Sequence, residues 1–257
     1  MTPARHPSLL RAVVRYCDRL LRTGEIEDWD GAVNGLQAEN DGRVTRIAAA
    51  VDASLATARA AIEAGADLLI VHHGLFWSPT IPWTGKRRDL LQTLLGGNLA
   101  VYSSHLPLDV HPKLGNNAVL CGALGFTRTQ PFFFEKGRKI GLKTVRRMNR
   151  TELAARLTRA LGEPPRMLPG GSEICRRIGV VTGGAGSELR KAASDGIDTF
   201  ITGEGPHWTF ALAEELGVNV FYGGHYLTET FGVRALAAHV SKRFRVPWQF
   251  IDRPTGL

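Results

Sequence analysis

The chain has 257 residues, of which 44% are hydrophobic and 22% charged, a composition that predicts a globular protein with a sizeable core. No apolar stretch approaches the roughly 20 residues of a membrane-spanning helix. The first residues lack the apolar block of a signal peptide, so we expect a cytoplasmic protein without a membrane segment. Three widely spaced cysteines, Cys17, Cys121 and Cys175, argue against both a disulfide framework and a Cys-based zinc site.

The formal net charge is +8, and a basic surface can bind nucleic acid or other anions. Arg11, Arg15, Arg19 and Arg22 recur at helical spacing near the start of the chain. Such a stripe is more typical of a solvated helix face, and no base-stacking aromatic motif accompanies it. Nucleic acid therefore stays a weaker alternative partner.

The first half of the chain alternates apolar runs with helical runs, a pattern typical of a parallel α/β sheet. Gly65 follows the first of these helical runs and suits the left-handed residue that often ends a helix. The expected strands are 47–51, 68–71 and 99–102, and the expected helices are 55–64 and 89–95.

Histidines follow two of these strands. His72 and His73 end the second strand, and only a local unwinding at Gly74 would let both neighbours reach one site, because adjacent strand residues point to opposite faces. His105 follows the third strand and precedes Asp109 by four residues. Pro107 between them predicts a loop.

A central segment, residues 127–176, separates the two halves. It contains an aromatic run at 132–134 and a predicted helix at 151–161, which Thr151 begins. The Pro/Gly-rich stretch 163–171 predicts a loop.

The second half repeats the first. Residues 46–74 align without gaps on 177–205, and the apolar pattern agrees as well. The expected strands are 178–181, 199–202 and 218–222, with helices at 187–194 and 208–216, then a helix at 228–242 and a last strand at 248–251. We therefore predict two duplicated α/β domains with largely parallel sheets, dividing near residue 126 into 1–126 and 127–257.

The second half carries its own polar residues at strand ends. His225 precedes Glu229 by four residues, which matches the spacing from His105 to Asp109, and Glu204 stands where the first half has His73. Ligands gather beyond the carboxyl ends of parallel strands, so these side chains predict one kind of site. Gly183-Gly184-Ala185-Gly186 predicts a tight turn near it, with phosphate binding as the alternative.

Imidazole and carboxylate ligands without thiolates suit Zn, Mn, Fe, Co or Ni. A carboxylate that bridges two such ions would create a water-activating pair. Glu204 could position a ligand or act as a general base.

Taken together, five motifs resemble those of the NIF-three-like dinuclear metal centre family, some of whose members are named type 2 GTP cyclohydrolase I homologues. The resemblance runs from about residue 8 to residue 252. The motifs are Asn34-Gly35-Leu36-Gln37, Val71-His72-His73-Gly74, His105 to Asp109 with Leu114-Gly115-Asn116-Asn117, Ile201-Thr202-Gly203-Glu204, and Gly224-His225 with Glu229.

The resemblance implies that the two duplicated α/β domains are intertwined. It also implies that the chains form a homo-hexameric ring with two divalent metal ions in each chain. Position by position, it implies that His72, Asp109 and Glu229 hold one ion, that His73, His225 and Glu229 hold the other, and that His105 lies beside the site. Tyr226 replaces a second histidine found in some members.

The resemblance also suggests a metal-dependent hydrolase of a nucleotide or phosphorylated heterocycle, in which Glu204 or His105 moves protons. The alternatives are a non-catalytic metal-binding scaffold or metallochaperone, and a nucleic-acid-binding ring.

Overall fold

The computed structural model describes residues 8–77 and 81–256, which form two compact α/β units. The first unit comprises the described residues up to Leu108 together with Val233–Arg253. The second comprises Asp109–Gly232 with the described residues that follow Arg253. The chain leaves the first unit within α4 (Leu106–Asp109) and returns to it within α9 (His225–Phe244).

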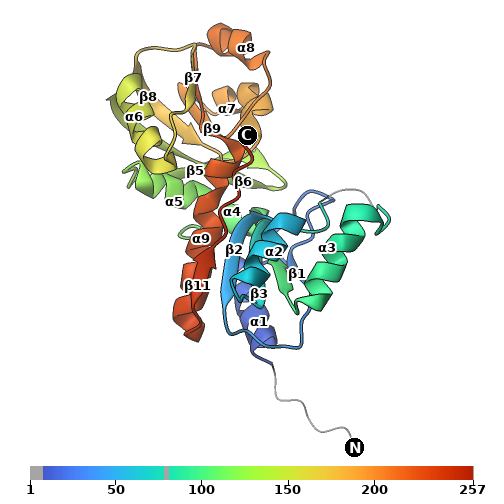
Figure 1. The fold of residues 1–257 in the computed structure, drawn as a ribbon. Coiled ribbons are helices and arrows are strands. Elements are labelled where there is room, and N and C mark those ends of the chain that lie inside the picture. The colour runs from blue at the N-terminus through green and yellow to red at the C-terminus, as the bar shows by residue number, and fades with distance from the viewer. Residues whose placement is uncertain (1–7, 78–80, 257) are drawn as a thin grey trace, which may run out of the picture. The chain divides into compact units, whose positions relative to one another are not determined.

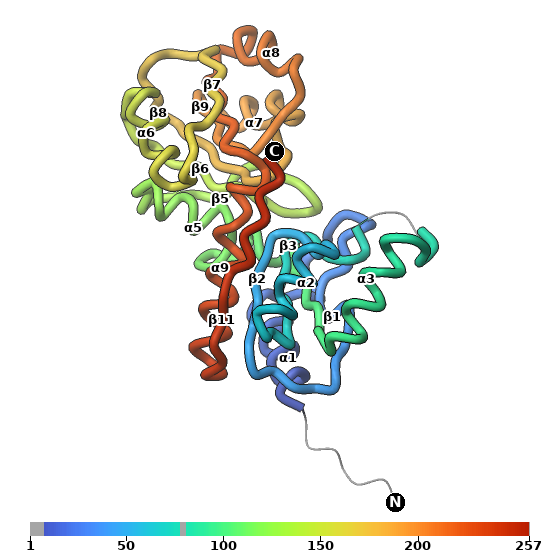
Figure 2. The backbone as a smooth tube through the Cα atoms, viewed as in Figure 1, coloured from blue at the N-terminus to red at the C-terminus, as the bar shows by residue number. Residues whose placement is uncertain are grey.

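The first unit is a five-stranded sheet in the order β1-β4-β3-β2-β11, in which only the edge strand β1 is antiparallel to its neighbour. The helix α2 crosses the near face of this sheet in Figure 1, and the tube in Figure 2 shows the same path. The elements are α1 (Leu9–Leu21), β1 (Gly35–Ala38), β2 (Ile47–Asp52), α2 (Leu55–Glu63), β3 (Leu68–His73), α3 (Gly85–Gly96), β4 (Ala100–Ser103) and β11 (Trp248–Phe250).

Both faces of this sheet are buried, which is why its strands read as unbroken apolar runs. Ala48, Leu69 and Val101 pack toward the side of α2 and α3. On strand β4 the next residue, Tyr102, donates a hydrogen bond to Asp18 of α1, 3.0 Å away, so α1 covers the opposite face.

The second unit is a six-stranded mixed sheet in the order β5-β6-β8-β9-β10-β7. Its centre, β8-β9-β10, is parallel, while β5, β6 and β7 pair antiparallel. The elements are α5 (Asn116–Ala123), β5 (Gln130–Glu135), β6 (Arg138–Asn149), α6 (Arg150–Leu161), β7 (Arg166–Pro169), β8 (Ile174–Val180), a 3₁₀ turn at Ala185–Glu188, α7 (Leu189–Ser194), β9 (Thr199–Thr202), α8 (Thr209–Leu216) and β10 (Asn219–Tyr222).

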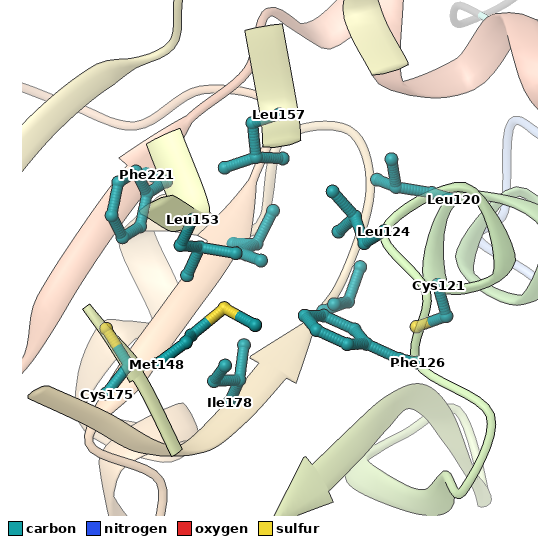
Figure 3. Packing of buried hydrophobic residues seen from close by; sticks show 12 residues of the cluster. Leu120, Cys121, Leu124, Phe126, Met148, Leu153, Leu157, Cys175, Ile178 and Phe221 are labelled. Carbon is teal, nitrogen blue, oxygen red and sulfur yellow. The ribbon is translucent and has the colours of Figure 1, made fainter. Parts of the chain in front are cut away.

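The core of the second unit lies between α5, α6 and one face of the sheet. Figure 3 shows Leu120 of α5 and Leu124, which follows it, on one side of the cluster, and Leu153 and Leu157 of α6 with Phe221 of β10 on the other. Each of these five side chains is almost completely buried.

The sequence repeat is a structural repeat. β2-α2-β3 and β8-α7-β9 follow the same order, and the third parallel strand, β4 or β10, carries an antiparallel edge strand in each unit. Gly65 and Gly196, which correspond, both adopt positive φ angles, +73° and +79°, after their helices.

Both repeats have an aspartate at the same position, and its hydrogen bonds explain why. Asp67 accepts backbone hydrogen bonds from Thr45 and Arg46 at the start of β2. Asp198 accepts the equivalent bonds from Arg176 and Arg177 in β8. In each unit one carboxylate therefore ties the parallel strand that follows a helix to the strand before it.

Three local predictions were wrong about the backbone. Residues 105–109 are not a loop: Pro107 lies in the first turn of α4, where its missing N–H costs no helical hydrogen bond. The last helix begins at His225 rather than Thr228. The Pro/Gly-rich stretch contains β7, an edge strand in which Pro169 is tolerated.

One strand is longer than predicted, and others were not predicted. β3 continues through both histidines without unwinding, because its ladder to β2 extends to the pair His73–Asp52. The strand β1 was not predicted, since its four residues contain Gly35 at φ +101° and lack an alternating pattern. The strands β5 and β6 of the central segment were not predicted either. Among the described residues, no helix has both the length and the apolar character that crossing a membrane requires.

The three cysteines are buried and free. Burial raises the pKa of the Cys17 thiol to about 12, with a smaller contribution from the charge of Asp18, and burial raises the pKa of Cys121 to about 12. Since the thiolate is the nucleophile, we expect iodoacetamide at pH 8 to leave both thiols unmodified in the native protein and to alkylate them in urea, as measured by mass spectrometry. Rapid alkylation of the native protein would contradict this burial.

The two repeated aspartates predict unequal stability effects. The Asp67 side chain is 7% exposed and that of Asp198 is 20% exposed. Asp67→Ala leaves buried N–H donors without an acceptor, so we expect it to lower the free energy of unfolding by about 2 kcal/mol. Asp198→Ala affects more exposed donors and should lower it by about 1 kcal/mol. Asp67→Asn, which keeps one acceptor, should cost less than Asp67→Ala. Urea denaturation measures all three, and equal losses for the two alanine variants would refute the argument from burial.

Candidate metal centre

Three imidazoles gather at the carboxyl ends of two neighbouring parallel strands in the first unit. His72 and His73 end β3. His105 is the second residue after β4, separated from it by Ser104. The ring centroids are 4.9 Å apart for His72–His73, 4.7 Å for His72–His105 and 5.7 Å for His73–His105. One ring nitrogen from each lies within 4.8 Å of those of the other two, a spacing that allows a shared metal ion.

Each of these rings has its Nδ1 atom bonded to an oxygen that can only accept. Nδ1 must therefore carry the proton, and in a neutral imidazole Nε2 then presents its lone pair. This is the arrangement that metal-binding histidines commonly have. The donor–acceptor pairs are His72 Nδ1 to the Ser104 carbonyl at 2.9 Å, His73 Nδ1 to Asp52 Oδ1 at 2.8 Å, and His105 Nδ1 to Asp28 Oδ1 at 2.8 Å.

Asp28 accepts hydrogen bonds through both of its carboxylate oxygens. Its side chain is 5% exposed, and its second oxygen accepts from Asn34 Nδ2 at 2.8 Å and from the Leu106 backbone N–H at 3.0 Å. Burial alone raises the pKa of Asp28, but the hydrogen bonds and charge of His105, with the bond from Asn34, outweigh it and lower that pKa. A buried carboxylate thus holds His105 in one orientation.

The second unit places a histidine between two carboxylates. His225 Nδ1 donates to Glu204 Oε1 at 2.8 Å, and His225 Nε2 lies 3.1 Å from Glu229 Oε2, one helical turn further along α9. Glu229 is 4% exposed and Glu204 is 45% exposed. Glu204 therefore orients His225 and keeps contact with solvent, while Glu229 is an interior carboxylate.

This pair of carboxylates favours a positive charge at His225. Burial alone lowers the pKa of His225, but the hydrogen bonds and charges of Glu229 and Glu204 outweigh it and raise that pKa to about 9. A proton supplies the charge at neutral pH, and a divalent cation offers the same complementarity to a carboxylate and an imidazole. The donor set of the second unit therefore fits a metal ion.

The glycine-rich turn packs against these ligands. A Cβ atom at Gly183, whose φ is +73°, would overlap the Glu229 carboxylate. The N–H groups of Gly183, Ala185 and Gly186 donate to Thr228, to Thr202 and to the Glu204 carbonyl. The turn uses these amides for internal bonds, which supports the tight-turn interpretation over phosphate binding.

Asp109 lies at the end of α4, and its Oδ1 accepts a hydrogen bond from Asn116 Nδ2 at 2.8 Å. The side-chain oxygen of Asn116 accepts from the Gly232 backbone N–H of α9 at 2.6 Å. The buried Asn116 side chain thus connects Asp109 to the helix that carries His225 and Glu229.

Sequence reasoning missed the residues that orient the imidazoles. Asp28 and Asp52 lie far along the chain from the histidines they hold, with separations of 77 and 21 residues. The signal that was available for Asp52 is its position at the end of β2, beside the strand end that carries His73.

The fold and these ligand clusters define an α/β protein that carries groups of imidazoles and carboxylates, able to hold a metal ion, at the carboxyl ends of its parallel strands. The model of the Duf34/NIF3 (NGG1p interacting factor 3) family matches residues 8–255, and the chain belongs to this family.

Curated relatives share this sequence over nearly its whole length. The protein named GTP cyclohydrolase 1 type 2 homolog in Deinococcus radiodurans is 44% identical over 247 residues, covering 95% of this chain and 93% of that protein. The protein of the same name in Halobacterium salinarum is 43% identical over 251 residues, covering 95% and 97%.

Solved structures share the fold. TTHA1606 from Thermus thermophilus is 41% identical with a TM-score of 0.88, covering 96% of this chain and 98% of that one. The protein ybgI, titled as of unknown function, is 35% identical with the same TM-score, covering 96% and 99%. HcgD from Methanocaldococcus jannaschii, at 22% identity and a TM-score of 0.84, shows the fold alone.

The role of Asp28 can be tested through the Nδ1 proton of His105. In Asp28→Asn the amide cannot accept from His105, Asn34 and Leu106 together, so the His105 ring loses its fixed orientation. We expect the wild type to show a low-field ¹H NMR resonance for the hydrogen-bonded Nδ1 proton of His105, and Asp28→Asn to lose it with unchanged circular dichroism. The matched control is Asp30→Asn, an exposed aspartate of the same loop. An unchanged resonance in Asp28→Asn would show that Asp28 does not hold the His105 ring.

Proposed function

We propose that this protein is a metal-dependent hydrolase that acts on a nucleotide or another phosphorylated heterocycle. The carrying observation is that four histidines, His72, His73, His105 and His225, each have Nδ1 bonded to a carbonyl or carboxylate oxygen. Structural histidines have no general need of such uniformity, whereas metal ligands do. The name shared by the curated relatives supports the nucleotide class of substrate.

The proposed ligands are His72, His73, Asp109, His225 and Glu229, which would hold two divalent ions with Glu229 shared between them. This assignment rests on the family resemblance. Nitrogen and oxygen donors of this kind accept Zn, Fe, Mn, Co or Ni. When bound, such ions supply Lewis-acid chemistry that polarises an oxygen and lowers the pKa of water. We further propose that the chains assemble as a homo-hexamer, as the family resemblance implies.

The chain's own residues have separable roles in this proposal. Glu204 holds the proton on His225 Nδ1 and, being half exposed, exchanges protons with solvent and carries them to or from the substrate. His105 positions the substrate or moves a proton through Nε2 while Asp28 holds its Nδ1. The nearly complete burial of His72 and Glu229 keeps competing water away from the donor atoms.

The number of bound ions and the activity test the proposal together. We expect protein purified without added metal to contain close to two divalent ions per chain by plasma mass spectrometry. Reloaded with the same metal after chelation, it should hydrolyse at least one member of a panel that includes GTP.

Two variants separate binding from chemistry. Glu229→Ala should lose metal and at least about 100-fold of the turnover, because it removes an interior ligand. Glu204→Gln retains an acceptor for His225, so it should keep its metal and lose about 100-fold in kcat. The control is Glu214→Ala, an exposed glutamate of α8. If the fully loaded wild type hydrolyses nothing in the panel, the hydrolase proposal is wrong, and rapid metal exchange would then favour a metallochaperone.

A further inference from the structure

Two tryptophans of the first unit lie against the histidine cluster. The ring of Trp77 is 4.7 Å from that of His105 and 5.3 Å from that of His73, centroid to centroid, and the ring of Trp29 is 5.4 Å from that of His105. The interplanar angles to His105 are 72° and 59°, so neither indole is stacked flat on that imidazole. Both indoles therefore border His105, and Trp77 also borders His73, a proposed metal ligand.

Both indoles are also exposed. Trp77 is 43% exposed and Trp29 is 39% exposed. Exposed apolar surface that gathers beside convergent polar groups is typical of ligand-binding sites. A third tryptophan nearby in sequence, Trp83, differs because its ring carries the Arg87 guanidinium at 4.7 Å.

The loops that carry Trp29 and Trp77 are fixed by the Asn34-Gly35-Leu36-Gln37 motif. Gln37 donates from Nε2 to the Val33 carbonyl and accepts from the Leu75 N–H at 2.6 Å. A Cβ atom at Gly74 would overlap the Gln37 amide, and one at Gly31 would overlap the Trp77 backbone. The motif thus packs the two loops together with little room to spare.

The same motif ties these loops to the imidazoles. Asn34 accepts from the His105 backbone N–H at 2.7 Å through Oδ1 and donates to Asp28 at 2.8 Å through Nδ2. The orientation of His105 and the position of Trp29, the residue after Asp28, are therefore set by one network. Because these side chains are already ordered, less conformational entropy is lost when a ligand binds.

We infer that Trp29 and Trp77 form an aromatic wall that stacks the planar heterocyclic ring of the substrate beside the histidine cluster. Indole faces bind flat π-systems of any base, and imidazole nitrogens adjoin the polar edge of a ring held there. An amphipathic flat ligand matches both surfaces, whereas a sugar phosphate matches only the polar one. This inference rests on the proposed function, because it names which part of that substrate the chain recognises.

The experiment uses binding, without hydrolysis, by the metal-loaded protein. The probe is 2-aminopurine riboside 5′-monophosphate, whose fluorescence is quenched when the ring stacks, and ribose 5-phosphate is the matched competitor that lacks the ring. We expect wild type to quench the probe, Trp29→Ala and Trp77→Ala each to raise Kd about 10-fold, and Trp29→Phe to keep most of the affinity. Trp208→Ala, which removes a 52% exposed tryptophan of the second unit, is the control and should bind as wild type.

Three outcomes would overturn the inference. They are wild type that does not quench the probe, alanine variants that bind it as wild type does, and displacement by ribose 5-phosphate as effective as displacement by unlabelled nucleotide. Metal content is measured in every variant, and loss of metal from both alanine variants would assign the tryptophans a structural role instead. Because hydrolysis is not read, wild type that stacks the probe but hydrolyses no nucleotide refutes the hydrolase proposal and leaves the stacking wall standing.

Discussion

The hydrogen bond from imidazole Nδ1 to a fixed oxygen is the constraint on which the site depends. An imidazole can rotate and exchange tautomers, and only a partner at one nitrogen fixes which nitrogen faces a ligand. Here the partners come from four different places: Asp52 at the end of β2, the Ser104 carbonyl after β4, Asp28 in the loop before β1, and Glu204 after β9. The fold brings these oxygens to the histidines, so the sheets and loops determine how each imidazole is oriented.

Duplication supplied two equivalent frames, and substitution made their strand ends chemically different. His73 and Glu204 occupy matched positions, yet one is an imidazole that donates to a carboxylate and the other a carboxylate that accepts from an imidazole. The first unit consequently gathers three imidazoles, and the second surrounds one imidazole with two carboxylates. The residues retained in both copies, such as Asp67 and Asp198, serve the backbone, which both frames need equally.

Much of the fold followed from periodicity. The parallel strands, the α2 and α6 helices and the glycines after the helices were predicted, because buried parallel strands and capped helices leave local signals. The antiparallel strands β1, β5, β6 and β7 were not predicted. β1 and β7 are short edge strands with Gly or Pro, which are held by their neighbours more than by their own residues. The alternation along β6 is interrupted by a register shift between Val145 and Met148. The helical turn at Pro107 was missed because proline opposes helix interiors and tolerates first turns.

The sequence by itself determined the α/β class, the repeat, the family and the identity of the candidate ligands, because residue types and their spacing are local properties of the chain. Tertiary structure decided what those ligands can do. Asp28 reaches His105 across 77 residues, and Asn34 and Gln37 connect three loops that no local pattern relates. Hydrogen bonds between distant segments exist only once the sheet has aligned its strand ends, so the orientation of the histidines and the position of the two tryptophans beside them are properties of the folded chain.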